Sequence, residues 1–373
     1  MDTLKTRQVS PDGAGRAVRV MVVTPLGEGG KGGIDRIMDE IRHRLEKSPR
    51  PDLSVSFQVT RGQGHIALSP LLVAGLLLRL AGRPFGFGPD VQHINLSSHG
   101  STLRKIAVAR TARLFGIPYI IHLHGSEFRS YWQGASPGLS GLIRDMFKHA
   151  SGILVLGRVW HDFILERVPE AGSRIEILPN ATPMPTQPRS AAGDVVTILF
   201  LGEVGARKGV PQLIEALSCL PRELPWRAII AGNGAIDEAK TALAGHGLSE
   251  RVAVPGWVGP ADVARLLSEA DVLVLPSFGE NLPMSVIEGM ARGLAVVTTP
   301  VGAVEDIIES ERTGLLVPPG DSKALAHALE RVVGDGELRR RLGDAAQAFH
   351  REHLEIGGYV ERLVTIWRDH ARR

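Results

Sequence analysis

The sequence has almost no cysteine, no long apolar run and no apolar segment near residue 1. The 373 residues include one cysteine, Cys219, which excludes an intrachain disulfide and a cysteine-based zinc or iron–sulfur site and suits a reducing cytoplasm. The longest apolar run, Leu71–Leu78, stops at Arg79 and is far shorter than the ~20 residues of a membrane span. Residues 1–16 are polar and broken by Gly and Pro, unlike a secretory signal. We therefore expect a cytoplasmic protein, either soluble or peripherally bound at the inner face of the plasma membrane.

Length and composition indicate two globular domains. The chain is 43% apolar and 22% charged, which gives enough hydrophobic mass for packed cores and excludes disorder as the main state. A length of 373 residues fits two domains of roughly 180 residues each.

Charge is divided unequally along the chain. Residues 1–180 hold 23 Lys and Arg against 15 Asp and Glu, a net of +8, and the remainder holds 20 against 25, a net of −5. A basic half suggests an anionic partner such as a membrane surface, although unequal solvated surfaces are an equally simple explanation. No nucleic-acid partner is expected.

Apolar, β-branched runs alternate with segments of helical period. This alternation predicts an α/β fold with parallel sheets covered on both faces. The expected strands are 18–24, 55–60, 91–95, 119–123, 153–156, 195–201, 227–231, 251–254, 272–275 and 294–298. The expected helices include 34–45, 210–220, 261–270, 284–292, 322–333 and 359–373.

A proline-rich stretch separates two strand–helix series. Four prolines within residues 179–188 cannot continue a helix or a strand, so this stretch is predicted to be a linker. Ligands of open parallel sheets bind beyond the carboxyl ends of the strands, so the cleft between the two domains is the expected active site. The predicted boundaries are a disordered tail at 1–16, a Rossmann-like domain at 17–179, a linker at 180–194, a second Rossmann-like domain at 195–355 and a C-terminal helix at 356–373.

Two glutamates flank a predicted helix start in the second half. Glu280 follows the buried strand 272–275 on a loop, Pro283 stands where a helix should begin, and Glu288 lies in the second turn of that helix. Backbone N–H groups at such a helix start attract anions. A pair of glutamates eight residues apart is common by chance, and the strand–loop–proline–helix context is what distinguishes this pair.

This segment resembles the E-x7-E signature of the retaining glycosyltransferases of family 4, which have the GT-B fold. The likeness continues through residues 299–303 and 313–321 and covers nearly all of 195–335. It implies two Rossmann-like domains with parallel sheets facing across a cleft, and a C-terminal helix that crosses back to the first domain. Residues 17–179 would then be the acceptor domain and residues 195–355 the nucleotide-sugar domain. It also implies that Glu288 binds the donor ribose, that Glu280 contacts the transferred sugar, and that the backbone of Asn281, Leu282 and Pro283 supports sugar and phosphate.

Residues 199–209 match the family loop that supplies cations to the donor phosphates. Lys208 stands at the place of the family lysine, but Glu203 stands where the family usually has an arginine. We expect Arg207 to replace that arginine, because a departing diphosphate accumulates negative charge. Gly232 and Asn233 resemble the family's glycine turn beside the nucleotide, although any tight turn would look similar.

The N-terminal half carries a glycine cluster and a histidine pair. Gly32 and Gly33 precede the first helix and match the family loop that passes the donor phosphates. His124 stands at the place of the family histidine that touches the sugar, whereas His122 is expected to be a packed strand residue. A two-histidine metal site is conceivable from the alternation, but the sequence offers no third ligand.

Two other classes of function remain open. Gly27, Gly29 and Gly32 spell G-x-G-x-x-G, so an NADP-dependent oxidoreductase using Arg61 is an alternative. However, no acidic residue follows the second strand to bind a ribose. A non-catalytic scaffold that binds a nucleotide-sugar is the other alternative, because Glu203 breaks the family pattern.

A basic helical segment in residues 99–113 includes Arg104, Lys105 and Arg110. Together with the apolar residues 71–80, it could sit at an anionic membrane and receive a lipid-diphosphate acceptor. A core helix is an equally good interpretation of the apolar piece.

The predicted function is transfer of a hexose from GDP-mannose or a UDP-sugar, with retention of configuration. The predicted acceptor is a glycan or a polyprenyl-diphosphate-linked sugar, as in exopolysaccharide or O-antigen lipopolysaccharide assembly, by analogy with the family. His124, Lys208 and Glu280 are the predicted catalytic residues. The resemblance implies no required metal and no cofactor.

Overall fold

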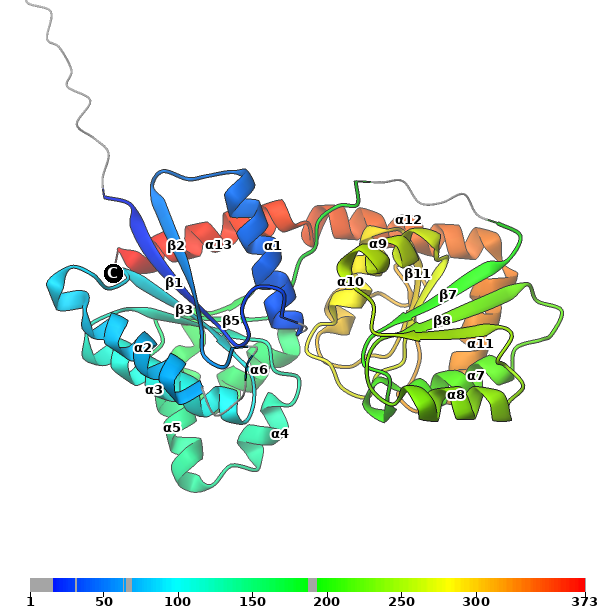
Figure 1. Cartoon of the computed structure of the whole chain (residues 1–373), viewed down its shortest axis with the longest axis horizontal. Helices are drawn as coiled ribbons and strands as arrows, with labels where there is room; N and C mark the ends of the chain where they lie inside the picture. Colours follow the sequence, from blue (N-terminus) through cyan, green and yellow to red (C-terminus); the bar gives the residue numbers. More distant parts are fainter. Residues whose placement is uncertain (1–15, 31, 63, 65–68, 187–192, 373) are drawn as a thin grey trace, which may run out of the picture.

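The computed structural model describes residues 16–30, 32–62, 64, 69–186 and 193–372. It contains two α/β domains that lie side by side, each built on a six-stranded parallel sheet (Figure 1). The predicted tail, apart from Arg16, lies outside the described residues, as do residues 187–192 of the predicted linker and Arg373 of the predicted last helix.

The N-terminal sheet has the order β2-β1-β3-β4-β5-β6. Its strands are β1 (Val18–Thr24), β2 (Leu53–Val59), β3 (Val91–Leu96), β4 (Tyr119–Leu123), β5 (Gly152–Val155) and β6 (Ile175–Ile177). The surrounding helices are α1 (Gly33–Lys47), α2 (Ser69–Ala81), η2 (Arg83–Phe85), α3 (Gly100–Leu114), α4 (Phe128–Gln133), α5 (Pro137–Lys148), α6 (Arg158–Arg167) and η3 (Pro169–Arg174).

The C-terminal sheet has the order β12-β11-β10-β7-β8-β9. Its strands are β7 (Val196–Leu201), β8 (Trp226–Ala231), β9 (Val252–Gly256), β10 (Val272–Leu275), β11 (Ala295–Thr298) and β12 (Leu315–Leu316). The helices are η4 (Ala206–Lys208), α7 (Val210–Ser218), α8 (Ile236–Gly245), α9 (Pro260–Glu269), α10 (Met284–Ala291), η5 (Val304–Asp306), α11 (Ser322–Gly334), α12 (Gly336–His353) and α13 (Ile356–Ala371).

The central strands are buried throughout and mostly apolar, because helices cover both faces of each sheet. Every residue of β4, β7, β10 and β11 is buried. Continuous apolar strands are typical of parallel sheets, whose crossover helices occupy both faces. The α/β class and the ten predicted strands are therefore confirmed, and each strand end lies within two residues of its predicted position.

The last helix returns to the N-terminal domain. After α12 lies along the C-terminal domain, α13 packs against α1, β1 and β3 (Figure 1). Its inward face carries Tyr359, Val360, Leu363 and Trp367, all of them buried in a core shared with Ile37 of α1. The predicted crossing of the C-terminal helix is confirmed.

The chain passes between the domains twice, and the two passages are joined. A parallel bridge pairs Thr182 with Glu355. The hydroxyl of Thr182 lies 2.8 Å from Nε2 of His350, and both residues are buried. The described start of the proline-rich stretch is thus packed against the end of α12.

Candidate active site

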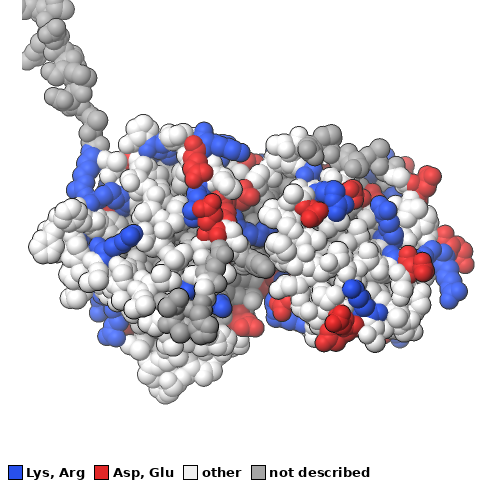
Figure 2. Space-filling view, viewed as in Figure 1, with Lys and Arg blue, Asp and Glu red and all other residues white. Residues whose placement is uncertain are grey.

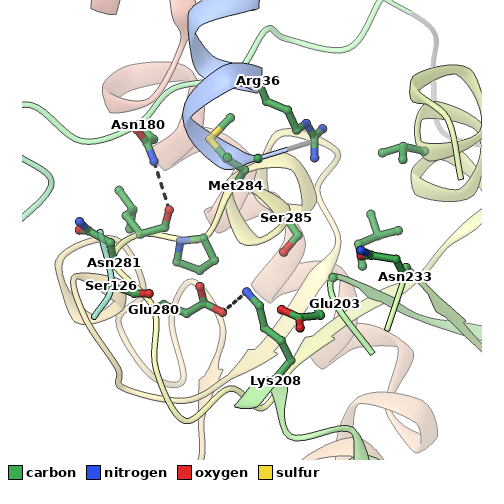
Figure 3. Close-up of a pocket in the computed structure, with 18 of the residues that line it drawn as sticks. Arg36, Ser126, Asn180, Glu203, Lys208, Asn233, Glu280, Asn281, Met284 and Ser285 are labelled. Carbon is green, nitrogen blue, oxygen red and sulfur yellow. Dashed lines mark hydrogen bonds and ion pairs between the residues drawn. The ribbon is translucent and has the colours of Figure 1, made fainter. Parts of the chain in front are cut away.

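A cavity of approximately 710 Å³ lies between the two domains. The carboxyl ends of both sheets border it, because strand-to-helix loops of each domain supply its walls. The predicted residues that line it are Gly32, Gly33, His124, Arg207, Lys208, Gly232, Asn233, Glu280, Asn281, Leu282 and Pro283. Loops from both halves of the sequence therefore meet around one space (Figure 3).

A buried ion pair forms the floor of the cavity. Lys208 Nζ donates a hydrogen bond to Glu280 Oε1 (Figure 3), and the two side chains are 14% and 9% exposed. The Ser277 hydroxyl donates to the same carboxylate oxygen at 2.7 Å. Lys208 and Ser277 therefore fix the Glu280 carboxylate. The carboxylate can accept a hydrogen bond from a sugar hydroxyl, and the lysine can bind a phosphate.

The loop that carries Lys208 can approach β10 only because a glycine follows it. Gly209 has φ of +72°, and a Cβ atom there would lie 2.0 Å from the carbonyl oxygen of Pro276. A side chain at this position would therefore meet backbone and not a movable side chain. The close approach sets Lys208 against Glu280.

The N-terminus of α10 faces the cavity above this pair. The helix begins at Met284, the first residue of the predicted range 284–292, and Pro283 is its N-cap rather than its first helical residue. Met284 and Ser285 line the cavity, and the first N–H groups of a helix have no partner within it. The glycine loop that precedes α1 lies opposite the start of α10, since a Cβ on Gly33 would be 4.0 Å from Cγ of Met284. The glycine loop of one domain thus meets the helix start of the other.

Arg207 lines the cavity but is already paired. Its guanidinium donates to Glu203 at 2.9 Å and to the carbonyl of Gly279 at 3.2 Å. Glu203, the residue that departs from the family pattern, therefore holds the arginine expected to compensate for it. Both side chains are exposed, so an incoming anion can compete for Arg207.

Glu288 lies just outside the cavity lining and is bound from the other domain. Arg36 of α1 donates to Glu288 Oε1, and Arg36 itself lines the cavity (Figure 3). Glu288 Oε2 is buried without a partner among the described residues. Burial raises the pKa of Glu288, and the nearby Arg36 opposes that rise. Sequence reasoning missed Arg36, whose position one turn into α1 carries no motif.

A buried aspartate supports the glycine loop of the N-terminal domain. Asp35 Oδ1 accepts hydrogen bonds from the backbone N–H groups of Leu26 and Gly27, both at 3.1 Å. Burial raises the pKa of Asp35. A Cβ on Gly30 would lie 2.6 Å from the Asp35 carboxyl carbon, so the loop packs tightly on this side chain. The aspartate gives the flexible glycine sequence one shape.

The glycine turn of the C-terminal domain packs against the loop after β7. Gly232 has φ of +155°, and a Cβ there would lie 1.6 Å from the carbonyl oxygen of Gly202. The backbone N–H of Val204 donates to the carbonyl of Asn233 at 2.6 Å. The Asn233 side chain is left at the cavity wall (Figure 3).

His124 sits at the cavity wall in front of two buried histidines. Its Nε2 lies 3.0 Å from Asn95 Oδ1, and burial lowers its pKa to about 3. His122 is fully buried, as expected of a packed strand histidine, and its Nδ1 lies 3.3 Å from His93 Nε2. The described residues contain no group of three His, Cys, Asp or Glu side chains placed to hold a metal ion.

Two asparagines join the domains at the cavity. Asn281 Nδ2 donates to the Leu123 carbonyl at the end of β4, and Asn180 Nδ2 donates to the Leu282 carbonyl (Figure 3), both at 3.2 Å. The second contact was not predicted, because Asn180 lies in the segment assigned to the linker.

The predicted membrane segment needs one correction. Lys105 is fully buried and donates to the Thr60 hydroxyl at 2.6 Å, so it cannot contact a membrane or an acceptor at the surface. Burial lowers its pKa to about 7, and Arg104 adds to the effect. Helical period alone did not show that this lysine points inward. Arg104 is half-buried and Arg110 is exposed, and neither lines the cavity.

Within the described residues, every helix is too short or too polar to cross a lipid bilayer.

Two family models match successive parts of the sequence. The model described as glycosyl transferase 4-like domain matches residues 6–181, and the model described as glycosyl transferases group 1 matches residues 187–349. Together they place the chain in the GT-B glycosyltransferase superfamily.

Individual relatives agree with this assignment. α-D-Kanosaminyltransferase of Streptomyces kanamyceticus is 25% identical over 69% of this chain and 72% of its own. The 2-deoxystreptamine glucosyltransferase of the same organism is 24% identical over 93% of this chain and 95% of its own.

Solved structures share the fold. Anabaena HepE in complex with UDP superposes with a TM-score of 0.74 at 16% identity, covering 94% of this chain and all of that one. Sucrose-phosphate synthase from Thermosynechococcus elongatus superposes with a TM-score of 0.76 at 18% identity, covering 94% and 98%. The GT-B fold predicted from the sequence is confirmed, and the oxidoreductase alternative is not favoured.

Proposed function

We propose that this glycosyltransferase moves a hexose from a nucleotide-diphosphate sugar, a UDP-sugar or GDP-mannose, to a glycan or polyprenyl-diphosphate-linked acceptor with retention of configuration. The observation that carries the proposal is the Lys208–Glu280 pair beneath the N-terminus of α10, inside a cavity formed by both domains. The pair offers a cation and a hydroxyl acceptor at adjacent points, which a sugar linked to a phosphate requires.

The groups around the cavity favour one orientation of the proposed donor. Its diphosphate would lie against Lys208, Arg207 and the N–H groups at the start of α10, where partial positive charge favours anions. Glu288, whose Oε2 has no partner among the described residues, would accept a ribose hydroxyl. The transferred hexose would lie between Glu280 and His124. HepE was solved in complex with UDP, so a UDP-sugar is the first donor to test.

The proposed chemistry uses groups that the chain and the donor supply. The bond between sugar C1 and the phosphate oxygen breaks, and the leaving diphosphate keeps the electron pair. The acceptor hydroxyl oxygen bonds to C1 on the same face, and its proton passes to the departing phosphate oxygen. Lys208, Arg207 and the helix start would stabilise the charge that develops on the diphosphate.

The proposed acceptor and location follow from the relatives and from the charge of the first half. One structural neighbour is a lipopolysaccharide outer core galactosyltransferase, with a TM-score of 0.69. A lipid-linked acceptor would place the enzyme at the cytoplasmic face of a membrane. Because other relatives are named for 2-deoxystreptamine acceptors, the acceptor panel must contain both classes.

The first experiment is a thermal-shift panel with UDP-, GDP- and ADP-sugars. The true donor should stabilise the protein by about 2.7 kcal/mol at 100 times its Kd, and the others much less. Product from that donor, with the anomeric configuration read by NMR, then tests transfer and retention. Absence of stabilisation by any nucleotide-sugar would reject the proposal, and binding without transfer to any acceptor would favour the scaffold alternative.

Mutation tests the assigned pair. Lys208→Met and Glu280→Gln should each lower kcat about 100-fold or more, because each removes a group that stabilises the transition state. Lys240→Met is the matched control, since Lys240 is an exposed lysine of α8 away from the cavity. Unchanged turnover in both site variants would remove these residues from the reaction.

A further inference from the structure

Apolar side chains cover the outer face of α2 and the turn that follows it. Leu71 and Leu78 are 70% and 74% exposed, and Phe85 and Phe87 are 77% and 85% exposed. Leu71 and Leu78 stand two turns apart on one side of α2, with the small Ala74 and Gly75 between them. The opposite side of α2 is equally apolar and is buried in the domain, through Val73, Leu76 and Leu80.

The neighbouring helix extends this surface. α3 packs beside α2 and exposes Leu103 and Leu114. Six of the eleven exposed large apolar side chains of the described chain therefore fall within residues 71–114. We refer to them as the α2–α3 face: Leu71, Leu78, Phe85, Phe87, Leu103 and Leu114. Apolar surface concentrated in this way marks an interaction site.

Basic side chains outnumber acidic ones around the α2–α3 face. Residues 53–126 contain seven Lys and Arg but a single acidic residue, Asp90, and Asp90 is paired with Arg19 at 3.1 Å. Arg79 of α2 and Arg110 of α3 are exposed beside the apolar side chains. The surface over α2 is white and blue in Figure 2, whereas red side chains gather nearer α1 and the cleft.

We propose that the α2–α3 face binds the surface of an anionic lipid bilayer, with the leucines and phenylalanines at the acyl boundary and Arg79 and Arg110 against the headgroups. A basic surface that also exposes apolar side chains gains from both components of such a bilayer. A second copy of the chain fits less well, because a symmetric contact would bring together the same arginines, which have no acidic partner in the described part of the chain. This docking surface lies on helices that do not line the active-site cavity.

Vesicle sedimentation with the full chain tests the proposal. Wild-type protein should bind phosphatidylcholine vesicles containing phosphatidylglycerol about tenfold more tightly than pure phosphatidylcholine vesicles, and added salt should weaken the binding. Phe85→Ser/Phe87→Ser and Arg79→Glu/Arg110→Glu should each reduce binding to the anionic vesicles about tenfold or more. Leu165→Ser on α6 and Arg312→Glu in the C-terminal domain are the matched controls and should bind as wild type does.

The outcomes separate this inference from the proposed function. Nucleotide-sugar stabilisation of the double variants should equal that of wild type, which shows that they are folded and that the cavity is intact. Equal binding to both kinds of vesicle, or unchanged binding in the double variants, would overturn the proposal. A dimer in solution that these substitutions convert to monomers, without vesicle binding, would identify the face as a contact between copies instead.

A buried amide fixes the orientation of His124. Asn95 on β3 is fully buried, and its Nδ2 donates to the Val23 carbonyl at 3.1 Å. That bond leaves Asn95 Oδ1 facing His124 Nε2 at 3.0 Å. Because an amide oxygen can only accept, Nε2 of His124 must carry the proton. The other ring nitrogen, Nδ1, then holds a lone pair.

We infer that Asn95 is a positioning residue that presents His124 to the cavity as a hydrogen-bond acceptor. On the proposed function, Nδ1 would accept from a hydroxyl of the sugar or of the acceptor. The titratable groups that face His124 are His122, whose ring centroid is 4.0 Å away, and His93 behind it. Burial lowers the pKa of both histidines. Both are therefore neutral at pH 7, and neither supplies a charge that would alter the protonation of His124.

Two measurements test the role of Asn95. Nitrogen-15 shifts of the histidine rings at neutral pH should show His124 protonated at Nε2 and bare at Nδ1, a result that does not depend on the reaction. Asn95→Asp should raise the pKa of His124, so kcat should fall as the pH is lowered below about 7, where wild type does not change. Gln92→Glu is the matched control, because Gln92 is a buried amide of β3 that contacts the Met21 sulfur on the opposite face of the sheet from Asn95.

A proton on Nδ1 in the wild type would overturn this inference, as would an Asn95→Asp profile identical to that of Gln92→Glu. A loss of stability that Asn95→Asp and Gln92→Glu share would show only the cost of a buried charge. If the wild-type protein transferred no sugar, the proposed function would be rejected, but the assignment of the His124 proton to Nε2 would stand.

Discussion

Removing one partner of the Lys208–Glu280 ion pair should destabilise the protein more than removing both. The side chains are 14% and 9% exposed, and Ser277 donates a further hydrogen bond to Glu280. In Lys208→Met the carboxylate keeps one neutral donor and loses its counter-charge. In Glu280→Gln the ammonium loses its counter-charge and keeps a weaker acceptor.

The expected cost follows from the burial of the pair. Breaking a buried ion pair on one side costs about 3–5 kcal/mol in general. This pair borders a cavity that water can enter, so we expect about 2 kcal/mol for each single variant. The double variant Lys208→Met/Glu280→Gln leaves no uncompensated charge and should lie within about 1 kcal/mol of wild type. The coupling energy should therefore be about 3 kcal/mol.

Urea unfolding of the four proteins measures that coupling. The exposed pair Arg312–Glu309, whose side chains are 70% and 63% exposed, is the matched control. Its cycle with Arg312→Met and Glu309→Gln should give less than about 0.5 kcal/mol. A coupling equally small at Lys208 and Glu280 would show that the two charges do not form a buried pair.

Three further predictions concern packing, backbone and pH. Trp367→Ala should lower the free energy of unfolding, measured in urea, by about 3–5 kcal/mol, because the indole of this α13 residue is fully buried against the N-terminal domain; a loss below about 1 kcal/mol would contradict that packing. Gly209→Ala should lower Tm and weaken nucleotide binding, because φ is +72° there and backbone lies 2.0 Å from a new Cβ, whereas Gly205→Ala, which meets open space, should do neither. Burial lowers the pKa of His350 to about 4; the unfolded chain takes up this proton first, so stability is full above about pH 6.5 and falls toward pH 4. Replacement by His350→Gln should make urea midpoints depend less on pH across that window, and an unchanged dependence would exclude His350 as a source.

Strands were predictable where burial on both faces left a continuous apolar run. Residues 196–201 and 272–275 gave such runs, and both became central strands. The short edge strands at 175–177 and 315–316 were missed, because three and two residues carry no period. The helix at 336–353 was also missed, since its surface is rich in charged residues and its buried positions are few.

Residues that line the cavity were predictable where they belong to loops of one domain. Lys208 and Glu280 come from separate loops of the C-terminal domain, and a motif marked each of them. Residues such as Arg36 were not predictable, because its importance lies in a contact with Glu288 across the domain boundary. The direction of Lys105 was not predictable either, because a lysine within a basic helix gives no sign that its own amine is buried.

The cavity depends on contacts that neither domain can make alone. Glu288 is held by Arg36, and the Asn281 amide is held by the last carbonyl of β4. Both C-terminal residues belong to the segment around the start of α10, so the N-terminal domain fixes the part of the site that would hold the sugar. The relative position of the domains is fixed in turn where the chain crosses twice, at the bridge between Thr182 and Glu355. A substitution at that bridge should therefore alter the sugar end of the cavity, while the Lys208 loop, packed on its own domain, keeps its place.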